Sequence, residues 1–183
     1  MNKKIKLLAV GMSLAVMLTA SGCEDQKKPS AGAGGAKVQQ SGKPAPKKVE
    51  VAVKLYYPDR QGMYLHEVTA KVDKDNKYKA AMQLLLAGPK EKKLMGIFPP
   101  GTKIRSLTVN NGRANIDFSH ELMDNFPGGS MVEEMIVGST VNTLTAFPEI
   151  KTVKISIAGK DTMILSNMDF VDPYERMPEL IKK

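Results

Sequence analysis

The chain has 183 residues and a formal net charge of +8 at pH 7, with one cysteine, two histidines and no tryptophan. A single cysteine excludes a disulfide within the chain and any zinc or iron–sulfur site built from several cysteines, and two separated histidines leave little material for a metal centre. A hydrophobic fraction of 42% and a charged fraction of 25% are ordinary for one globular domain.

Residues 1–22 have the pattern of a signal peptide for export. Three lysines among the first six residues precede an uncharged apolar run over residues 7–18. Twelve residues of helix rise only about 18 Å, short of the roughly 30 Å hydrocarbon core of a bilayer. Small residues follow the apolar run, so we expect cleavage after Gly22 rather than a membrane-spanning helix.

Cys23 directly follows this signal. The segment Ala20-Ser21-Gly22-Cys23 resembles the bacterial lipobox, although Leu is commoner than Ala at the first position. In a lipobox the cysteine thiol takes a diacylglyceryl group and becomes the mature N-terminus. The alternative is an incidental thiol beside an ordinary signal. Because the signal, the small residues and the only cysteine coincide, the sequence predicts a fatty-acylated lipoprotein, held at the extracytoplasmic side of the cell membrane by Cys23.

Residues 23–48 form the predicted link between this anchor and a folded domain. After Cys23 the segment is rich in Lys, Pro, Gly and Ala and has almost nothing apolar to bury, so we expect a disordered tether. Such a chain spans about 25–30 Å on average and roughly 80–90 Å when stretched. Most of the excess positive charge lies in the signal and the tether, which removes the main support for nucleic-acid binding.

A single domain is predicted over residues 49–166, and two strands begin it. Apolar and polar residues alternate over residues 49–57, the period of a half-buried strand. A second strand is expected over residues 63–72. Its alternation slips between Leu65 and Val68, which indicates a β-bulge.

Two helices are also predicted. Either Asp75 or Asn76 can cap the first helix, and the Gly-Pro pair at residues 88–89 ends it. Residues 130–133 form a capping box, with Ser130 first and Glu133 fourth. This box predicts a second helix that reaches about Ala146.

The remaining strands complete the predicted fold. Residues 104–109 and 114–118 face each other across an Asn-Asn-Gly hairpin, and further strands are expected at residues 153–157 and 162–165. The order is β-β-α-β-β-α-β-β. It indicates an α+β fold with one mixed sheet and both helices on one face, followed by an irregular tail over residues 167–183.

Candidate catalytic residues do not form a known site. Both histidines, His66 and His120, are expected on the surface or at a domain edge, not as ligands. Asp117, Glu121 and Asp124 are close in sequence and predict an acidic corner, whereas paired glycosidase carboxylates usually come from separate elements. The sequence therefore predicts no catalytic, cofactor-binding or metal-binding residue. A hydrolase that uses Asp117 and Glu121 stays open as an alternative.

Four motifs occur in order along the predicted domain: residues 81–89, 98–102, 111–119 and 141–159. Together they resemble the GerM domain of bacterial sporulation and germination proteins, over residues 49–165. The resemblance implies a small module similar to the ring-building units of secretion and sporulation assemblies. It carries over no catalytic residue. Some members of that family hold two such domains in tandem, and this chain has length for one.

The expected function is that of a non-enzymatic, lipid-anchored scaffold or assembly factor in the cell envelope, in sporulation or germination. Its expected partner is an envelope protein or a second copy, with no cofactor, metal or nucleic acid. The alternative is a module that binds cell-wall glycan or peptide. Because the chain lacks tryptophan, exposed Tyr56, Tyr57 or Tyr64 would then form the binding surface.

Overall fold

The computed structural model describes residues 49–160, 165–166 and 168–183. The predicted signal peptide, Cys23 and the tether therefore lie outside the described residues, as does most of the strand expected at residues 162–165. The predicted α+β fold with a single compact domain is confirmed. Among the described residues, the domain has two sheets and three α-helices, together with two short 3-10 turns, η1 (Lys74–Asn76) and η2 (Pro178–Leu180).

The first sheet is an antiparallel pair, β1 (Glu50–Pro58) and β2 (Leu65–Asp73). Its register runs without interruption from Glu50 opposite Asp73 to Pro58 opposite Leu65, so the predicted bulge is wrong. The apolar alternation slips because both faces of this sheet are covered at one end. Leu65 packs on one face with Tyr56, and Val68 packs on the other against the main core.

The second sheet has the strand order β3-β4-β5-β6. Its members are β3 (Ile104–Asn110), β4 (Arg113–Phe118), β5 (Thr152–Ile157) and β6 (Tyr174–Glu175). The predicted hairpin joins β3 to β4, with positive φ angles of 50° at Asn111 and 77° at Gly112. These angles fit a type I′ turn, which the Asn-Gly pair favours. β4 and β5 are parallel, and the other two pairs are antiparallel.

Helix α1 (Lys77–Ala87) ends at Gly88, whose φ of 86° an L-residue rarely adopts. Its predicted cap differs from the one observed. Asn76 occupies the capping position without a side-chain bond, while the Asp73 carboxylate accepts a bond from the Asp75 amide at the start of η1. The short η1 turn therefore places the capping residue, Asp73, three positions before Asn76 and four before the first residue of α1.

Helices α2 (Glu121–Asp124) and α3 (Ser130–Leu144) follow β4. The predicted capping box is wrong, because Gly129 precedes the helix and Ser130 is already its first residue. Glu133 is fully buried, and its carboxylate accepts a bond from the Ser166 amide at 2.8 Å. The Glu133 side chain therefore bonds to a segment distant in sequence instead of capping the start of its own helix.

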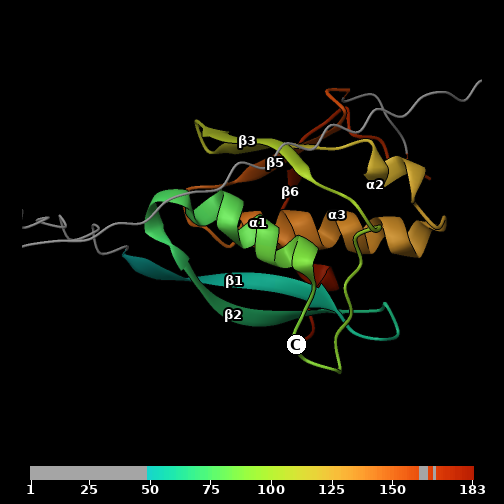
Figure 1. The fold of residues 1–183 in the computed structure, drawn as a ribbon, viewed down its shortest axis with the longest axis horizontal. Helices are drawn as coiled ribbons and strands as arrows, with labels where there is room; N and C mark the ends of the chain where they lie inside the picture. Colours follow the sequence, from blue (N-terminus) through green and yellow to red (C-terminus); the bar gives the residue numbers. More distant parts are fainter. Residues whose placement is uncertain (1–48, 161–164, 167) are drawn as a thin grey trace, which may run out of the picture. The chain divides into compact units, whose positions relative to one another are not determined.

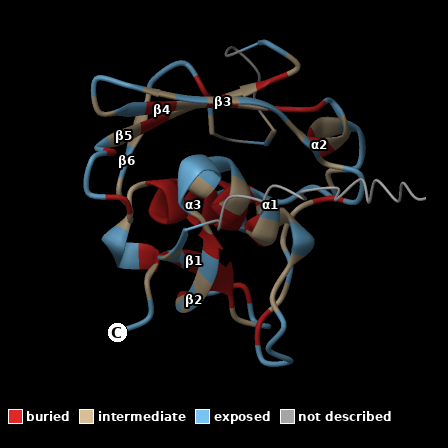
Figure 2. Cartoon of the chain, turned by 60° about the vertical axis from the view of Figure 1, so that its left-hand side comes forward, coloured by how far each residue is buried: buried red, intermediate tan, exposed pale blue. Residues whose placement is uncertain are grey.

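Helices α1 and α3 lie between the two sheets, as Figures 1 and 2 show. The predicted single sheet with both helices on one face is therefore corrected to three layers. Every residue from 135 to 144 of α3 is buried. A helix with a single apolar face packs against one sheet, whereas a helix that is buried on all sides needs packing partners on all of its sides. The two-stranded sheet supplies the second neighbour.

The C-terminal segment packs into this core. Phe170 is 1% exposed and Leu180 is 8% exposed. Asn142 of α3 holds the segment by two bonds to the backbone of Met177: its amide donates to the carbonyl at 3.0 Å, and its carbonyl accepts from the N–H at 3.1 Å. A Cβ at Gly138 would lie 2.5 Å from Leu180 Cδ1, so glycine allows this close approach. Residues 168–181 are thus mostly irregular in conformation yet part of the fold.

Glu149 links the start of α1 to the loop after α3. Its carboxylate accepts bonds from Lys77 Nζ and from the Tyr78 hydroxyl, each at 2.5 Å. The bond from Lys77, followed by the bond from Tyr78, lowers the pKa of Glu149 to about 2. The Tyr78 ring in turn packs edge-on against Phe147, with 4.9 Å between ring centroids.

We expect Glu149→Gln to remove an acid-sensitive part of the stability. A lowered carboxyl pKa stabilises the fold above the unfolded value of about 4.3, and this stabilisation is lost as the pH falls toward 2. Because the Glu149 side chain is 40% exposed, its contribution is under about 1 kcal/mol. Urea unfolding at pH 7, 4 and 2.5 should show a difference from wild type that shrinks with acid. Glu50→Gln, at an exposed strand end, should follow the wild-type profile, and an equal effect there would contradict the assignment.

Candidate functional site

The residues considered for catalysis lie in separate polar networks. Asp117 contacts Arg105 at 2.8 Å, and it accepts bonds from the Ser156 hydroxyl at 3.0 Å and the Gly159 amide at 2.9 Å. Exposed Asp124 pairs instead with His120 at 2.7 Å. The predicted acidic corner is therefore divided between the face of the second sheet and α2. Asp117 has structural partners on β3 and β5, as expected of a carboxylate that ties strands together.

The two other candidates also have local partners. A bond from Ser119 lowers the pKa of Glu121, a short-range contact at the start of α2. His66 lies partly exposed, 3.8 Å from the Asp59 carboxylate. Within residues 49–160, 165–166 and 168–183, no group of three or more His, Cys, Asp or Glu is arranged to hold a metal ion. The side chains of these candidates therefore do not come together at one shared site.

Two of the three tyrosines considered for glycan binding are buried. Tyr56 is 2% exposed, Tyr57 is 3% exposed and Tyr64 is 37% exposed. Arg176 donates a bond to the Tyr56 hydroxyl at 2.8 Å, and this hydroxyl donates to Glu67 at 2.9 Å. Alternation along β1 predicts Tyr56 at the surface, but the C-terminal segment covers that face. The aromatic surface of the glycan-binding alternative is thus reduced to Tyr64.

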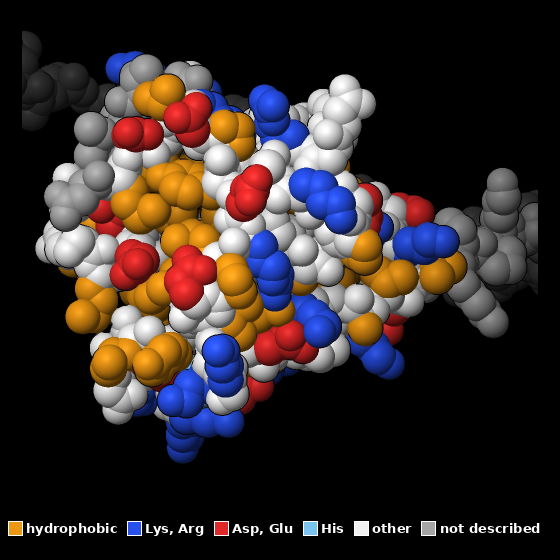
Figure 3. All heavy atoms as spheres, turned by 180° about the vertical axis from the view of Figure 1, so that it is seen from behind, with side chains coloured by type: hydrophobic (Ala, Val, Ile, Leu, Met, Phe, Trp, Pro, Cys, Tyr) orange, Lys and Arg blue, Asp and Glu red, His pale blue; other side chains and the backbone are white. Residues whose placement is uncertain are grey.

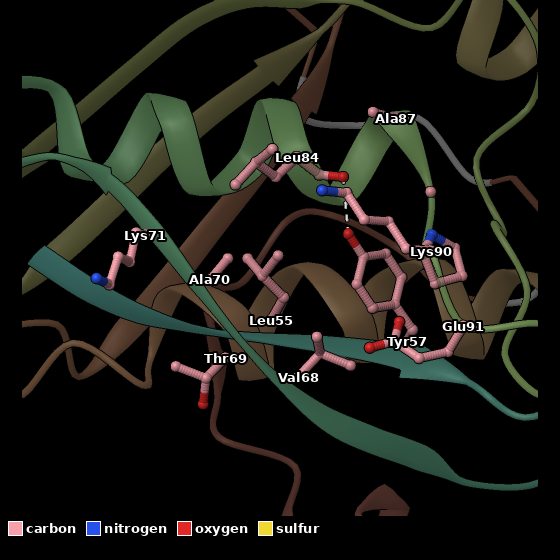
Figure 4. Close-up of a pocket in the computed structure, with 12 residues that line it drawn as sticks. Leu55, Tyr57, Val68, Thr69, Ala70, Lys71, Leu84, Ala87, Lys90 and Glu91 are labelled. Carbon is pink, nitrogen blue, oxygen red and sulfur yellow. Dashed lines mark hydrogen bonds between the residues drawn. The ribbon is translucent and has the colours of Figure 1, made fainter. Parts of the chain in front are cut away.

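A groove of about 510 Å³ lies between β2 and the end of α1 (Figure 4). Its apolar lining comes from both sheet strands and the helix: Leu55, Tyr57, Val68, Ala70, Leu84, Ala87 and Pro89. The Tyr57 hydroxyl donates to the Leu84 carbonyl at 2.7 Å across the floor. Burial, together with the nearby Glu91 carboxylate, raises the pKa of Tyr57 to about 12. Tyr57 is therefore a neutral donor at any physiological pH.

The groove is bordered by the outer edge of β2. The Leu65 carbonyl points away from β1 and accepts a bond from the Lys182 amide at 2.9 Å. Strand residues two apart point the same way, so the backbone groups of Glu67, Thr69 and Lys71 also face outward. Beyond Leu65, no described strand pairs with this edge. Thr69 and Lys71 line both the edge and the groove.

The opposite edge of the sheet is occupied near the end of β1, at residues 56–58. The Tyr56 amide donates to Thr143 Oγ1 of α3 at 3.1 Å, and the Met95 amide donates to the Pro58 carbonyl at 3.0 Å. An unpaired strand edge beside an apolar groove is the arrangement that accepts an extended peptide as an added strand. Sequence reasoning missed this groove. The sequence feature that could have indicated the groove is a pair of small residues, Ala70 in β2 and Ala87 at the end of α1. Their small side chains leave room between the strand and the helix.

Comparison with known proteins finds a matching family model and similar solved structures. A family model named Germane, described as sporulation and spore germination, matches residues 54–162. The first GerMN domain of the sporulation protein GerM from Bacillus subtilis is similar in structure, with a TM-score of 0.58 and 27% identity over 69% of this chain and 98% of that one. A search of curated proteins gave no match.

Two further solved structures share the fold. The tandem GerMN domains of Bacillus subtilis GerM match with a TM-score of 0.59 and 22% identity, covering 79% of this chain and 51% of theirs, so this chain spans about half of that pair. A candidate lipoprotein from Clostridium perfringens matches with a TM-score of 0.51 and 24% identity, over 73% of this chain and 93% of that one. In the part of the chain that the structure describes, no helix is both long and apolar enough to cross a bilayer. Since the family model covers more than half of the sequence, from β1 to the turn after β5, this chain belongs to the Germane family of sporulation and spore-germination proteins.

Proposed function

We propose that the protein is a non-enzymatic, lipid-anchored assembly factor of sporulation or germination that acts on the extracytoplasmic side of the membrane. The main support for this proposal is membership of the Germane family. The signal-type N-terminus and the lipobox-like segment ending in Cys23 support the anchor. The candidate lipoprotein from Clostridium perfringens has the same fold, which is consistent with this location.

The groove and the outer edge of β2 are the proposed docking site for a protein partner. An added strand would use the outward backbone groups of Glu67, Thr69 and Lys71, and its side chains would enter the apolar groove. Charged side chains at both ends of this edge disfavour indiscriminate pairing, as they do on many exposed strands. The partner is accordingly expected to be a protein that presents an extended, apolar segment.

Thr69→Pro tests this docking site. The Thr69 amide faces away from β1, so proline removes an outward donor while the ladder within the sheet stays intact. Thr69→Val keeps the amide and the branched shape, and it serves as the matched control. We expect crosslinking in intact envelopes of sporulating cells, followed by mass spectrometry, to recover a defined envelope protein with wild type and Thr69→Val. The yield with Thr69→Pro should fall about tenfold, since even a single lost backbone bond costs about 1 kcal/mol and the ring adds a clash.

Two results would contradict the proposal. An unchanged crosslink to the same protein in Thr69→Pro would remove the β2 edge from the interface. Recovery of wall fragments alone would favour the glycan-binding alternative. Equal membrane levels of all three proteins, checked by immunoblot, separate loss of docking from loss of the protein.

A further inference from the structure

Four chain segments lie side by side at the end of the first sheet where β1 ends and β2 begins. Leu94 forms a bridge with Asp59, Pro58 pairs with Leu65, and Leu65 forms a bridge with Ile181. At a strand spacing of about 4.8 Å, the row is roughly 15 Å wide. We call this region the basic end and define it as residues 59–64, 90–94 and 181–183.

The basic end carries a concentrated positive charge. Six exposed cations belong to it: Arg60, Lys90, Lys92, Lys93, Lys182 and Lys183. None of the six forms an ion pair with any residue that the structure describes. Its two acids are Asp59 and Glu91, and the Asp59 carboxylate already accepts a bond from the Met63 amide. Figure 3 shows Lys and Arg side chains gathered at the lower end of the molecule.

Two exposed apolar side chains also belong to the basic end. Met63 is 58% exposed and Tyr64 is 37% exposed, at the tip of the loop between the strands. Lys182 Nζ lies 4.5 Å from the centroid of the Tyr64 ring. The Arg60 guanidinium donates to the Lys92 carbonyl at 2.6 Å, which holds two of the loops together. Cations flanking exposed apolar and tyrosine side chains are typical of proteins that rest on a membrane surface.

The geometry of the chain allows this contact. Residue 49 lies at the far end of β1, about 30 Å from the basic end at the usual rise for the nine residues of the strand. The 25 residues between Cys23 and residue 49 reach roughly 80–90 Å when extended. The extended length of these 25 residues exceeds the length of β1. The basic end can therefore face the membrane in which Cys23 would be anchored.

We propose that the basic end binds the anionic headgroups of a phospholipid bilayer. The lysines and Arg60 contact lipid phosphates, while Met63 and Tyr64 enter the boundary between headgroups and acyl chains. This contact orients the domain on the membrane, which a single point of attachment at Cys23 does not do. It goes beyond the proposed function and requires neither lipid on Cys23 nor a protein partner.

Residues 45–183 suffice for the test, because they form one compact unit that contains the whole described core. A single GerMN domain has likewise been solved by itself. Cosedimentation with vesicles of phosphatidylcholine and phosphatidylglycerol in equal parts should show binding that weakens with added salt. Vesicles of phosphatidylcholine alone should show none. The triple variant Lys90→Gln, Lys92→Gln and Lys93→Gln should bind roughly a hundredfold more weakly, given the usual contribution of each cation near an anionic surface.

The matched control removes three exposed lysines that lie outside the basic end, by Lys74→Gln, Lys79→Gln and Lys160→Gln. It should retain binding within about threefold, since charges beyond a Debye length are screened. If vesicle binding weakened equally in both triple variants, the proposal would be overturned, and binding would be attributed to the overall charge of the domain. Binding to purified anionic wall polymer without binding to the vesicles would also overturn it.

A tryptophan reporter tests the depth of contact, because the chain has no tryptophan of its own. Met63→Trp should shift its fluorescence to the blue when anionic vesicles are added. Val171→Trp, at a site that is 52% exposed and outside the basic end, should not. The same shift at both sites, or at neither, would contradict insertion at the basic end. Because no anchor and no partner enter these measurements, their failure would leave the proposed function standing.

Discussion

Asn142→Ala should lower the free energy of unfolding by about 2–4 kcal/mol and release the C-terminal segment from α3. Asn142 is fully buried, and its side chain satisfies both the N–H and the carbonyl of Met177. Alanine leaves both backbone groups without these partners and creates a small cavity, and each lost partner costs about 1–3 kcal/mol. Urea denaturation measures the loss. Trypsin should also cleave after Arg176 much faster, because Arg176 is held against Tyr56 only while the segment is docked.

Ser139→Ala is the matched control in the same helix. Ser139 is fully buried, and its hydroxyl has no hydrogen-bond partner among the residues that the structure describes. Removing an unsatisfied hydroxyl should leave stability unchanged or raise it by up to about 1 kcal/mol. If Asn142→Ala kept wild-type stability and wild-type resistance at Arg176, the two bonds to Met177 would not hold the segment.

Cys23→Ala should release nearly all of the protein from the membrane or leave it as an unprocessed precursor. Stable anchoring takes at least two acyl chains, and without the thiol the chain has no site for the proposed diacylglyceryl group. Fractionation of envelopes shows where the protein goes, and intact mass shows whether the lipid is present. Ala20→Leu moves the segment toward the commoner lipobox and should be processed like wild type. Unchanged mass and membrane retention in Cys23→Ala would refute lipidation.

The regular elements could be read from the sequence because local chemistry fixes them. Asn111 and Gly112 adopt the positive φ angles of the turn that joins β3 and β4, and Gly88 ends α1 where expected. Alternation also located β1 and β5. These signals depend on residues within a few positions of one another, so no knowledge of the fold was needed.

The errors share one physical origin, which is packing between distant segments. Tyr56 alternates like a surface residue, yet the segment carrying Arg176 covers it. Glu133 has the spacing of a capping residue, yet it is buried against Ser166. The groove likewise depends on how far Ala70 and Ala87 stand apart in space, which the sequence does not state. Local patterns predicted the elements, but the layers and the groove follow from contacts that span most of the chain.

The docking of the C-terminal segment also governs when the protein can finish folding. The bond between Arg176 and Tyr56 joins residues 120 positions apart, and the one between Tyr56 and Thr143 spans 87. Topologies with many such distant contacts fold slowly, because the chain entropy is lost before the contacts form. Until residues 172–183 are docked, the apolar surfaces around Tyr56 and Leu65 stay uncovered. The speed of this closure therefore affects how long a newly made chain stays open to proteases and to aggregation.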